Sequence, residues 1–164
     1  MFWLQCFGVL NFCYWSVPLI ITDIKKLILP DHWVLCLLGS GLYFNHMSLY
    51  LTQADALLSA MLGYLILTGI YYIFLWIRKA EGLGQGDIKL CAALLAWIGI
   101  LNLGWLLTLA SLFTLGLKFL LGHSFKFLKK YAGPFAQRQI PLGPGLIFAG
   151  LVLLIKIILK APAI

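Results

Sequence analysis

The sequence is poor in charged residues, and acidic residues are the scarcest of them. Charged residues make up 10% of its 164 positions and hydrophobic residues 63%, whereas a typical soluble domain has about 25% and roughly 45–50%. A soluble fold of this length could not bury so much apolar surface. The composition therefore excludes an ordinary soluble enzyme and indicates a protein that lies in the lipid bilayer.

The sequence also lacks paired cysteines of the metal-binding type. Its four cysteines are Cys6, Cys13, Cys36 and Cys91. No two of them form a CxxC motif and no histidine lies at ligand spacing, so a zinc site is not expected. All four fall in apolar stretches, where cysteine behaves as a small core residue. We expect neither a metal nor a cofactor.

Six apolar runs dominate the chain, at about 2–22, 33–51, 56–77, 88–101, 104–121 and 142–159. A spanning helix needs about 20 apolar residues. We therefore predict an all-α, polytopic membrane protein of about six transmembrane helices, forming a single domain over residues 1–164. The first run lacks the basic start and cleavage site of a signal peptide, so it is expected to be a retained helix. The fourth run is short and is expected either to begin within the membrane plane or to continue into 102–104.

The net charge of +7 comes mainly from the segments between these runs. If the N-terminus is outside, ten of the twelve Lys and Arg residues are cytoplasmic and only Lys156 and Lys160 are not. This positive-inside bias predicts that both chain ends are extracytoplasmic. The basic residues then face anionic lipid, and nucleic acid is not expected as a partner. The loop at about 122–141 mixes basic and aromatic residues, which is typical of an interfacial segment; a substrate-docking surface is the alternative.

Only five acidic residues occur, and in a membrane protein each needs a reason. Two of them have a structural interpretation. Asp55 closes a Thr-Gln-Ala-Asp sequence that resembles a capping box. Asp31 follows Pro30 at the start of the second run and is interpreted as a helix N-cap. The other three are Asp23, Glu81 and Asp87.

Asp23 and Asp87 do not have an equally simple explanation. Asp23 ends the first run, where a carboxylate faces the negative end of the helix dipole; the alternative is a boundary residue paired with Lys25. Asp87 opens the fourth run and could be an ordinary N-cap. However, Gly84 and Gly86 precede it, and glycine permits positive φ and a close approach of another backbone. A phosphate loop is excluded because the helix opens with an acid and no Walker lysine follows.

Both aspartates lie at the cytoplasmic boundary of the predicted topology. Two carboxylates in one partly dry site can share a proton, so that one acts as a base and the other as an acid. The base activates a water molecule, and the acid polarises a peptide carbonyl and protonates the leaving amine. This is the chemistry of aspartic proteolysis. Spacing alone does not show whether Asp23 and Asp87 meet.

Three short motifs follow one another along the chain. They are Asp23 ahead of Ile28-Leu29-Pro30-Asp31, then Gly84-Gln85-Gly86-Asp87-Ile88-Lys89-Leu90, then Pro141-Leu142-Gly143-Pro144. In kind and in order these motifs resemble those of the type IV prepilin peptidases.

The resemblance implies a multi-pass enzyme of the bacterial cytoplasmic membrane that removes short basic leaders from prepilins and pseudopilins. It also implies that Asp23 and Asp87 are catalytic and that Gly84 and Gly86 adjoin the substrate. Glu81 and Lys89 are assigned to the substrate side as well, with solvation of the loop as the alternative for both.

One departure from the family pattern limits the expected activity. Larger members have an N-terminal segment with paired CxxC motifs that is associated with N-methylation of the cut pilin. This sequence starts at a membrane helix and has no CxxC motif, so methyltransferase activity is not expected. Two other functions stay open: a small proton-coupled transporter or channel subunit that uses both aspartates, and a non-catalytic assembly factor. Against a transporter, both acids lie on one side of the membrane and none near its middle.

Overall fold

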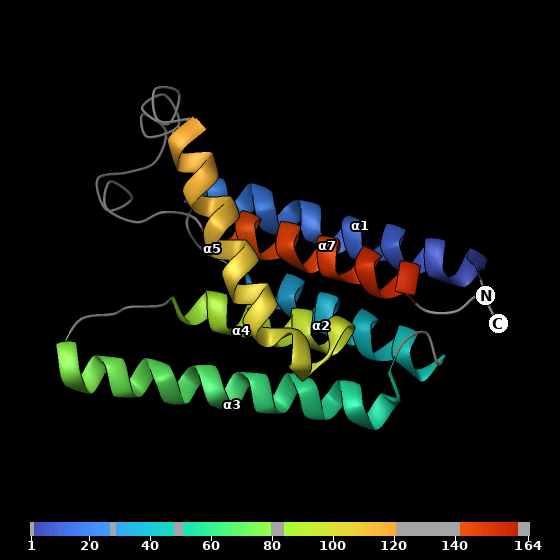
Figure 1. The fold of residues 1–164 in the computed structure, drawn as a ribbon, viewed down its shortest axis with the longest axis horizontal. Helices are drawn as coiled ribbons and strands as arrows, with labels where there is room; N and C mark the ends of the chain where they lie inside the picture. The colour runs from blue at the N-terminus through green and yellow to red at the C-terminus, as the bar shows by residue number, and fades with distance from the viewer. Residues whose placement is uncertain (1, 27–28, 48–50, 80–83, 121–141, 161–164) are drawn as a thin grey trace.

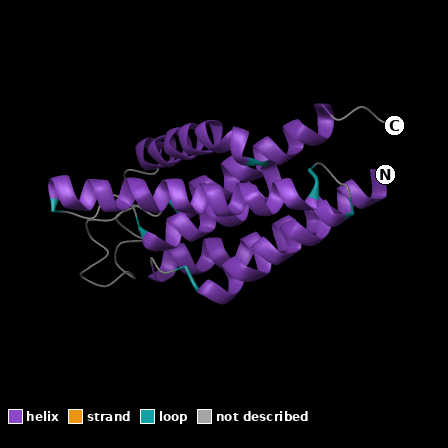
Figure 2. Ribbon diagram, turned by 90° about the horizontal axis from the view of Figure 1, so that it is seen from below, coloured by secondary structure: helices purple, strands orange, loops and turns teal. Residues whose placement is uncertain are grey.

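The computed structural model describes residues 2–26, 29–47, 51–79, 84–120 and 142–160, and every regular element in these ranges is helical (Figures 1 and 2). The predicted all-α class is confirmed, and each apolar run coincides with one α-helix. In chain order the elements are α1 (Phe2–Lys26), α2 (Asp31–His46), α3 (Gln53–Arg78), α4 (Gln85–Ile98), the 3-10 helix η1 (Ile100–Asn102), α5 (Leu103–Leu120) and α7 (Gly143–Lys160).

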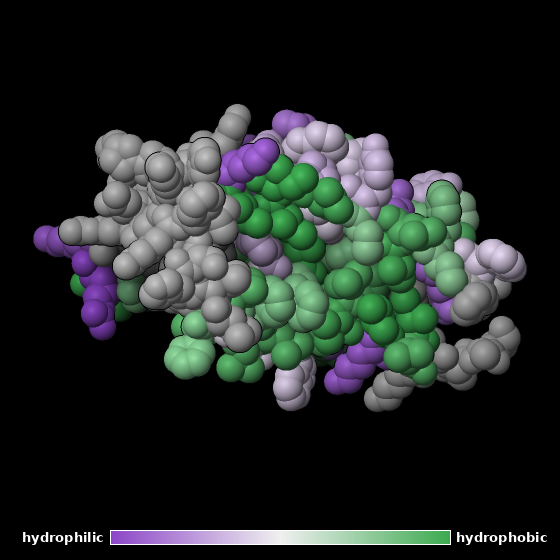
Figure 3. All heavy atoms as spheres, turned by 90° about the horizontal axis from the view of Figure 1, so that it is seen from above, coloured by the Kyte–Doolittle hydropathy of each residue, from purple (hydrophilic) through white to green (hydrophobic). Residues whose placement is uncertain are grey.

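The surface of the bundle is apolar. Within the described ranges, three segments are long and apolar enough to cross a membrane, by length and composition: Trp3–Lys25, Gln53–Arg78 and Ile100–Leu117. Large side chains project outward, with Trp76 84% exposed and Leu101 93% exposed. Figure 3 shows a broad area of hydrophobic residues on one face of the molecule. Apolar surface of this extent marks a contact with lipid or with another protein, and the segments of spanning length favour lipid, in agreement with the predicted membrane protein.

Helix α4 lies at the centre of the bundle. It packs against α2, α3 and α7, and the described side chains of Ile88 and of residues 90–98 are all buried. A helix that is apolar on every side is a core helix, which explains why this run is shorter than the others. The helix ends at Ile98 and is capped by Gly99, whose φ of 82° favours glycine. The predicted continuation into 102–104 is therefore wrong, because the chain turns at Gly99 and continues as η1.

A buried indole fixes α4 against α1 and α2. Trp97 is fully buried and its Nε1 donates a hydrogen bond to the carbonyl oxygen of Leu37, 3.0 Å away. Its ring stacks on Phe44 and meets Phe12 edge-on, with centroids 5.6 Å and 5.5 Å apart. Gly41 leaves room for the indole, since a Cβ there would lie 2.7 Å from it. This contact sets the position of α4 relative to the helix that carries Asp23.

The structure confirms one of the two predicted helix caps and contradicts the other. Thr52 Oγ1 accepts the backbone N–H of Asp55 at 3.1 Å and donates to its carboxylate at 2.7 Å, so the capping interaction is confirmed. The N-cap role of Asp31 is wrong. Helix α2 has Pro30 as its N-cap residue with no side-chain cap, and Asp31 is the first residue of the helix. Its carboxylate is bound instead by Lys89 of α4.

Candidate active site

Asp23 lies in the last turn of α1 and is 5% exposed. Its Oδ2 accepts a buried hydrogen bond from the backbone N–H of Gly143, 3.0 Å away. Gly143 is the first residue of α7, where backbone N–H groups have no partner within the helix and the dipole is positive. Asp23 therefore sits unfavourably at the end of its own helix but favourably at the start of another. Lys25, its alternative partner, is exposed.

Asp87 lies in the first turn of α4, outside the three apolar segments named above. It is not the N-cap, because Gly84 occupies that position and the Gly84 carbonyl oxygen accepts the N–H of Asp87 at 3.1 Å. Burial, and after it the negative charge of Asp23, raise the pKa of the Asp87 carboxyl to about 6. The structure thus brings the two candidate carboxylates into one electrostatic environment, which spacing alone could not show.

The two glycines of the Gly-x-Gly-Asp sequence have different neighbours. A Cβ on Gly84 would lie 3.0 Å from Oδ2 of Asp87, and a Cβ on Gly86 would lie 3.2 Å from Leu29. Both sites are crowded by side chains, whereas the close approach of another backbone stays a prediction. The predicted positive φ is wrong: Gly84 has a φ of −70°, and Gly99 is the positive-φ glycine of the described ranges. These glycines are needed for space and not for an unusual backbone conformation.

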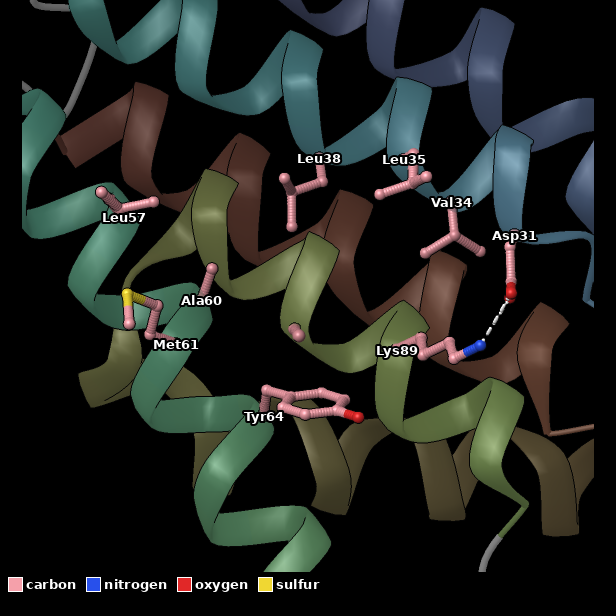
Figure 4. Close-up of a pocket in the computed structure, with 10 residues that line it drawn as sticks. Asp31, Val34, Leu35, Leu38, Leu57, Ala60, Met61, Tyr64 and Lys89 are labelled. Atoms are coloured by element: carbon pink, nitrogen blue, oxygen red, sulfur yellow. Dashed lines mark hydrogen bonds and ion pairs between the residues drawn. The ribbon is translucent and has the colours of Figure 1, made fainter.

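Lys89 joins α4 to α2. Its Nζ lies 2.8 Å from both carboxylate oxygens of Asp31 (Figure 4). The Lys89 side chain is 41% exposed and that of Asp31 64%. The pair lies at one end of an apolar groove of about 400 Å³ between α2, α3 and α4. Tyr64 of α3 also lines this groove. Glu81, the other flanking residue predicted for the site, lies outside the described residues.

The two carboxylates have different neighbours. Asp23 accepts an amide hydrogen bond from the first residue of α7. Asp87 has a raised pKa and so holds a proton at a higher pH than an ordinary aspartate. Two interacting carboxyl groups can share one proton, so that one acts as the base and the other as the acid of a reaction.

Comparison with known proteins identifies the family. The profile of the type IV leader peptidase family matches residues 10–122, which is more than half of the chain. The chain belongs to this family. The match contains both Asp23 and Asp87 and confirms the resemblance drawn from the motifs.

Curated proteins that are similar to this chain carry names consistent with this family. The prepilin leader peptidase/N-methyltransferase of Aeromonas salmonicida (strain A449) is 39% identical over 143 residues, 85% of this chain and 45% of the relative. The protein of that name from Xanthomonas campestris pv. campestris is 34% identical over 148 residues, which are 90% of this chain and 49% of the relative. The one from Pectobacterium carotovorum is 44% identical over 92 residues, which are 56% of this chain and 33% of the relative. The chain thus spans half or less of each relative's length. No solved structure matches it.

Sequence reasoning missed one residue of this candidate site. Gly143 belongs to the Pro-x-Gly-Pro sequence, which indicated only the opening of the last helix; Pro141 lies outside the described residues. The match to the family profile ends at residue 122 and does not reach it. Gly143 is 120 positions from Asp23, so no local pattern could place them together. The available signal was a glycine at the start of a helix, where a free N–H can meet an acid.

Proposed function

We propose that this protein is a membrane-embedded aspartic endopeptidase that removes the short basic leader of type IV prepilins or of pilin-like pseudopilins. The observation that supports the proposal is that Asp87 of α4 lies within the electrostatic influence of Asp23 of α1, whose negative charge helps to raise its pKa. Membership of the type IV leader peptidase family supports it. The curated relatives are named for prepilin leader cleavage, and a precursor of that kind is the partner proposed for this chain.

The pair supplies a complete acid–base mechanism. Asp23, as the carboxylate, takes a proton from a water molecule, and the water oxygen attacks the scissile carbonyl carbon. Asp87 donates its proton to the carbonyl oxygen, which forms a tetrahedral diol. Collapse of the diol breaks the C–N bond as Asp23 gives its proton to the leaving amine and Asp87 takes a proton from a diol hydroxyl. Asp23 is then again ionised and Asp87 again protonated, so each carboxyl returns to its starting state.

We further propose that all six helices cross the bacterial cytoplasmic membrane, with both chain ends outside and lipid around them. In Figure 1 the start of α1 and the end of α7 lie at one end of the bundle. The end of α1 and the starts of α4 and α7 lie toward the other, where Asp23 meets Gly143. An even number of crossings has this arrangement. The candidate site then faces the cytoplasm, where the basic loops are predicted.

This topology predicts the location of two reporters. A reporter fused at Lys129 should be cytoplasmic and one fused at the C-terminus should be extracytoplasmic, because one crossing lies between them. Paired phosphatase and fluorescent-protein fusions measure this directly. Finding both positions on the same side would contradict the six-span topology.

The Asp31–Lys89 pair gives a prediction of a small effect. Asp31→Asn should retain leader cleavage, because Asp31 is bound by Lys89 and the pair is exposed. Exposed ion pairs contribute about 0.2–1 kcal/mol, so the melting temperature should fall only slightly. Cleavage and thermal unfolding of the purified variant measure the two effects. A loss of cleavage as deep as that of Asp23→Asn would place Asp31 in the catalytic site instead.

The direct test of the proposed function is coexpression with a leader-bearing prepilin. Removal of the leader increases the mobility of the substrate on a denaturing gel, and the new N-terminus can be sequenced. Uncut prepilin in cells that hold the protein in the membrane would contradict the proposal. A transporter would then show ion flux that depends on Asp23 and Asp87, and an assembly factor would depend on neither residue.

A further inference from the structure

The N-terminus of α7 meets the carboxylate of Asp23 closely. The N–H of Gly143 donates to Oδ2 at 3.0 Å, within the buried interior. At the same place there is no room for a side chain. A Cβ on Gly143 would lie 2.6 Å from Oδ2 of Asp23 and 3.0 Å from its carboxyl carbon. Carbon atoms are not found so close to a carboxylate oxygen, so the contact requires glycine.

We infer that Gly143 is a positioning residue, which holds the Asp23 carboxylate in its reactive orientation by one backbone hydrogen bond and by the lack of a side chain. This inference rests on the proposed peptidase function. Asp23 itself touches the reacting water, and Gly143 acts only through Asp23. The residue thus gives α7 a role in the reaction although α7 contributes no acid or base to it.

The physical argument is one of orientation. A carboxylate on a helix end can rotate about two side-chain bonds, and a single hydrogen bond from a fixed amide removes most of that freedom. A Cβ at position 143 would push the carboxylate away and break the hydrogen bond. Misplacement of a reacting group by about 1 Å costs on the order of 100-fold in rate. The loss should fall on kcat, because substrate binding does not depend on the direction of one oxygen atom.

The chain offers a matched control on the same helix face. Gly150 lies seven residues after Gly143, which is two turns of α7. A Cβ on Gly150 would also be crowded, at 3.0 Å from a methyl group of Leu94 and 3.5 Å from Phe12. These neighbours are ends of apolar side chains and none is an acid. Gly150→Ala therefore tests crowding of α7 without disturbing Asp23.

The kinetic experiment compares both variants with the unmutated protein in detergent, using a purified leader-bearing prepilin. Gly143→Ala should lower kcat by about 100-fold at unchanged KM, whereas Gly150→Ala should keep kcat even if it unfolds at a lower temperature. A kcat of Gly143→Ala equal to that of the unmutated enzyme would overturn the inference. Equal losses of kcat in the two variants would overturn it as well, because they would indicate general crowding of α7.

A second measurement does not depend on activity. In Asp23→Ala the carboxyl group is gone and the nearest remaining atom, Cβ, would lie 3.4 Å from a Cβ at position 143. Gly143→Ala should therefore lower the melting temperature of the unmutated protein but hardly that of Asp23→Ala. An equal decrease in both backgrounds would overturn the inference. Absence of cleavage by the unmutated protein would instead overturn the proposed function, and the coupling between the two positions would still be measurable.

Discussion

Replacing either aspartate of the pair by asparagine is expected to stop leader cleavage. Asparagine keeps the size of the side chain and can still accept the N–H of Gly143, so Asp23→Asn should fold and insert. It cannot exchange a proton, which both the base and the acid must do. The rate should fall by at least about 1,000-fold in each variant, as for other residues that act as one catalytic unit. A coexpressed prepilin followed on a gel measures this loss.

The double variant distinguishes a pair from two independent residues. Asp23→Asn with Asp87→Asn should be no worse than either single variant, because one missing partner already disables the reaction. Asp55→Asn is the matched control. Asp55 caps α3 with Thr52, and asparagine caps helices about as well as aspartate, so cleavage should be retained. If Asp23→Asn cleaved at the rate of the unmutated protein, the assignment of Asp23 to the catalytic pair would be wrong. Asp31 would then be the next candidate partner of Asp87.

Gly86→Val should abolish cleavage while leaving insertion into the membrane intact. One Cβ on Gly86 already comes within 3.2 Å of Leu29, and valine adds two more methyl groups beside Asp87. Either Leu29 or the start of α4 must move. A displacement of Asp87 by about 1 Å would cost on the order of 100-fold in rate. Membrane fractionation and the prepilin assay measure the two properties separately.

A compensating change shows what Gly86 makes room for. Leu29→Ala removes the side chain that valine would meet, so Gly86→Val with Leu29→Ala should recover much of the activity. Failure of this rescue would mean that the backbone of the substrate, and not Leu29, needs the space, as the sequence motif predicts. Gly86→Ala adds a single methyl group and should lose much less activity. A fully active Gly86→Val enzyme would show that the segment before α4 is only a connection.

The helices could be predicted from the sequence because their signals are local. Each apolar run is bounded by charged or turn-forming residues, and each coincides with an observed helix. Thr52 and Asp55 form their cap within three residues of one another, so the pattern of side chains was sufficient. Asp23 was recognisable as unusual for a similar reason, since its charge opposes the dipole of its own helix.

The contacts between helices could not be predicted in this way. An apolar run is equally consistent with lipid or with other helices around it, so nothing in residues 88–98 indicated that α4 is a core helix. Asp31 was assigned to its own helix because the alternative partner, Lys89, is 58 positions away. The hydrogen bond of Asp23 with Gly143 and its charge interaction with Asp87 also join positions that are far apart in the sequence. Both depend on how α1, α4 and α7 pack, and packing is a property of surfaces that are far apart in the sequence.

The long separation between Asp23 and Gly143 has a consequence for biosynthesis. At roughly 5–20 residues per second, the 120 positions between them take about 6–24 seconds to synthesise. During that interval the first helices can insert and pack, but Asp23 has no hydrogen-bond donor and the side of α4 that later contacts α7 faces lipid. Helix α7 leaves the ribosome well after α1 and α4, and it supplies the donor that binds Asp23. A nascent chain that stalls before α7 would therefore be left in the membrane as an inert bundle, not as an unfinished protease.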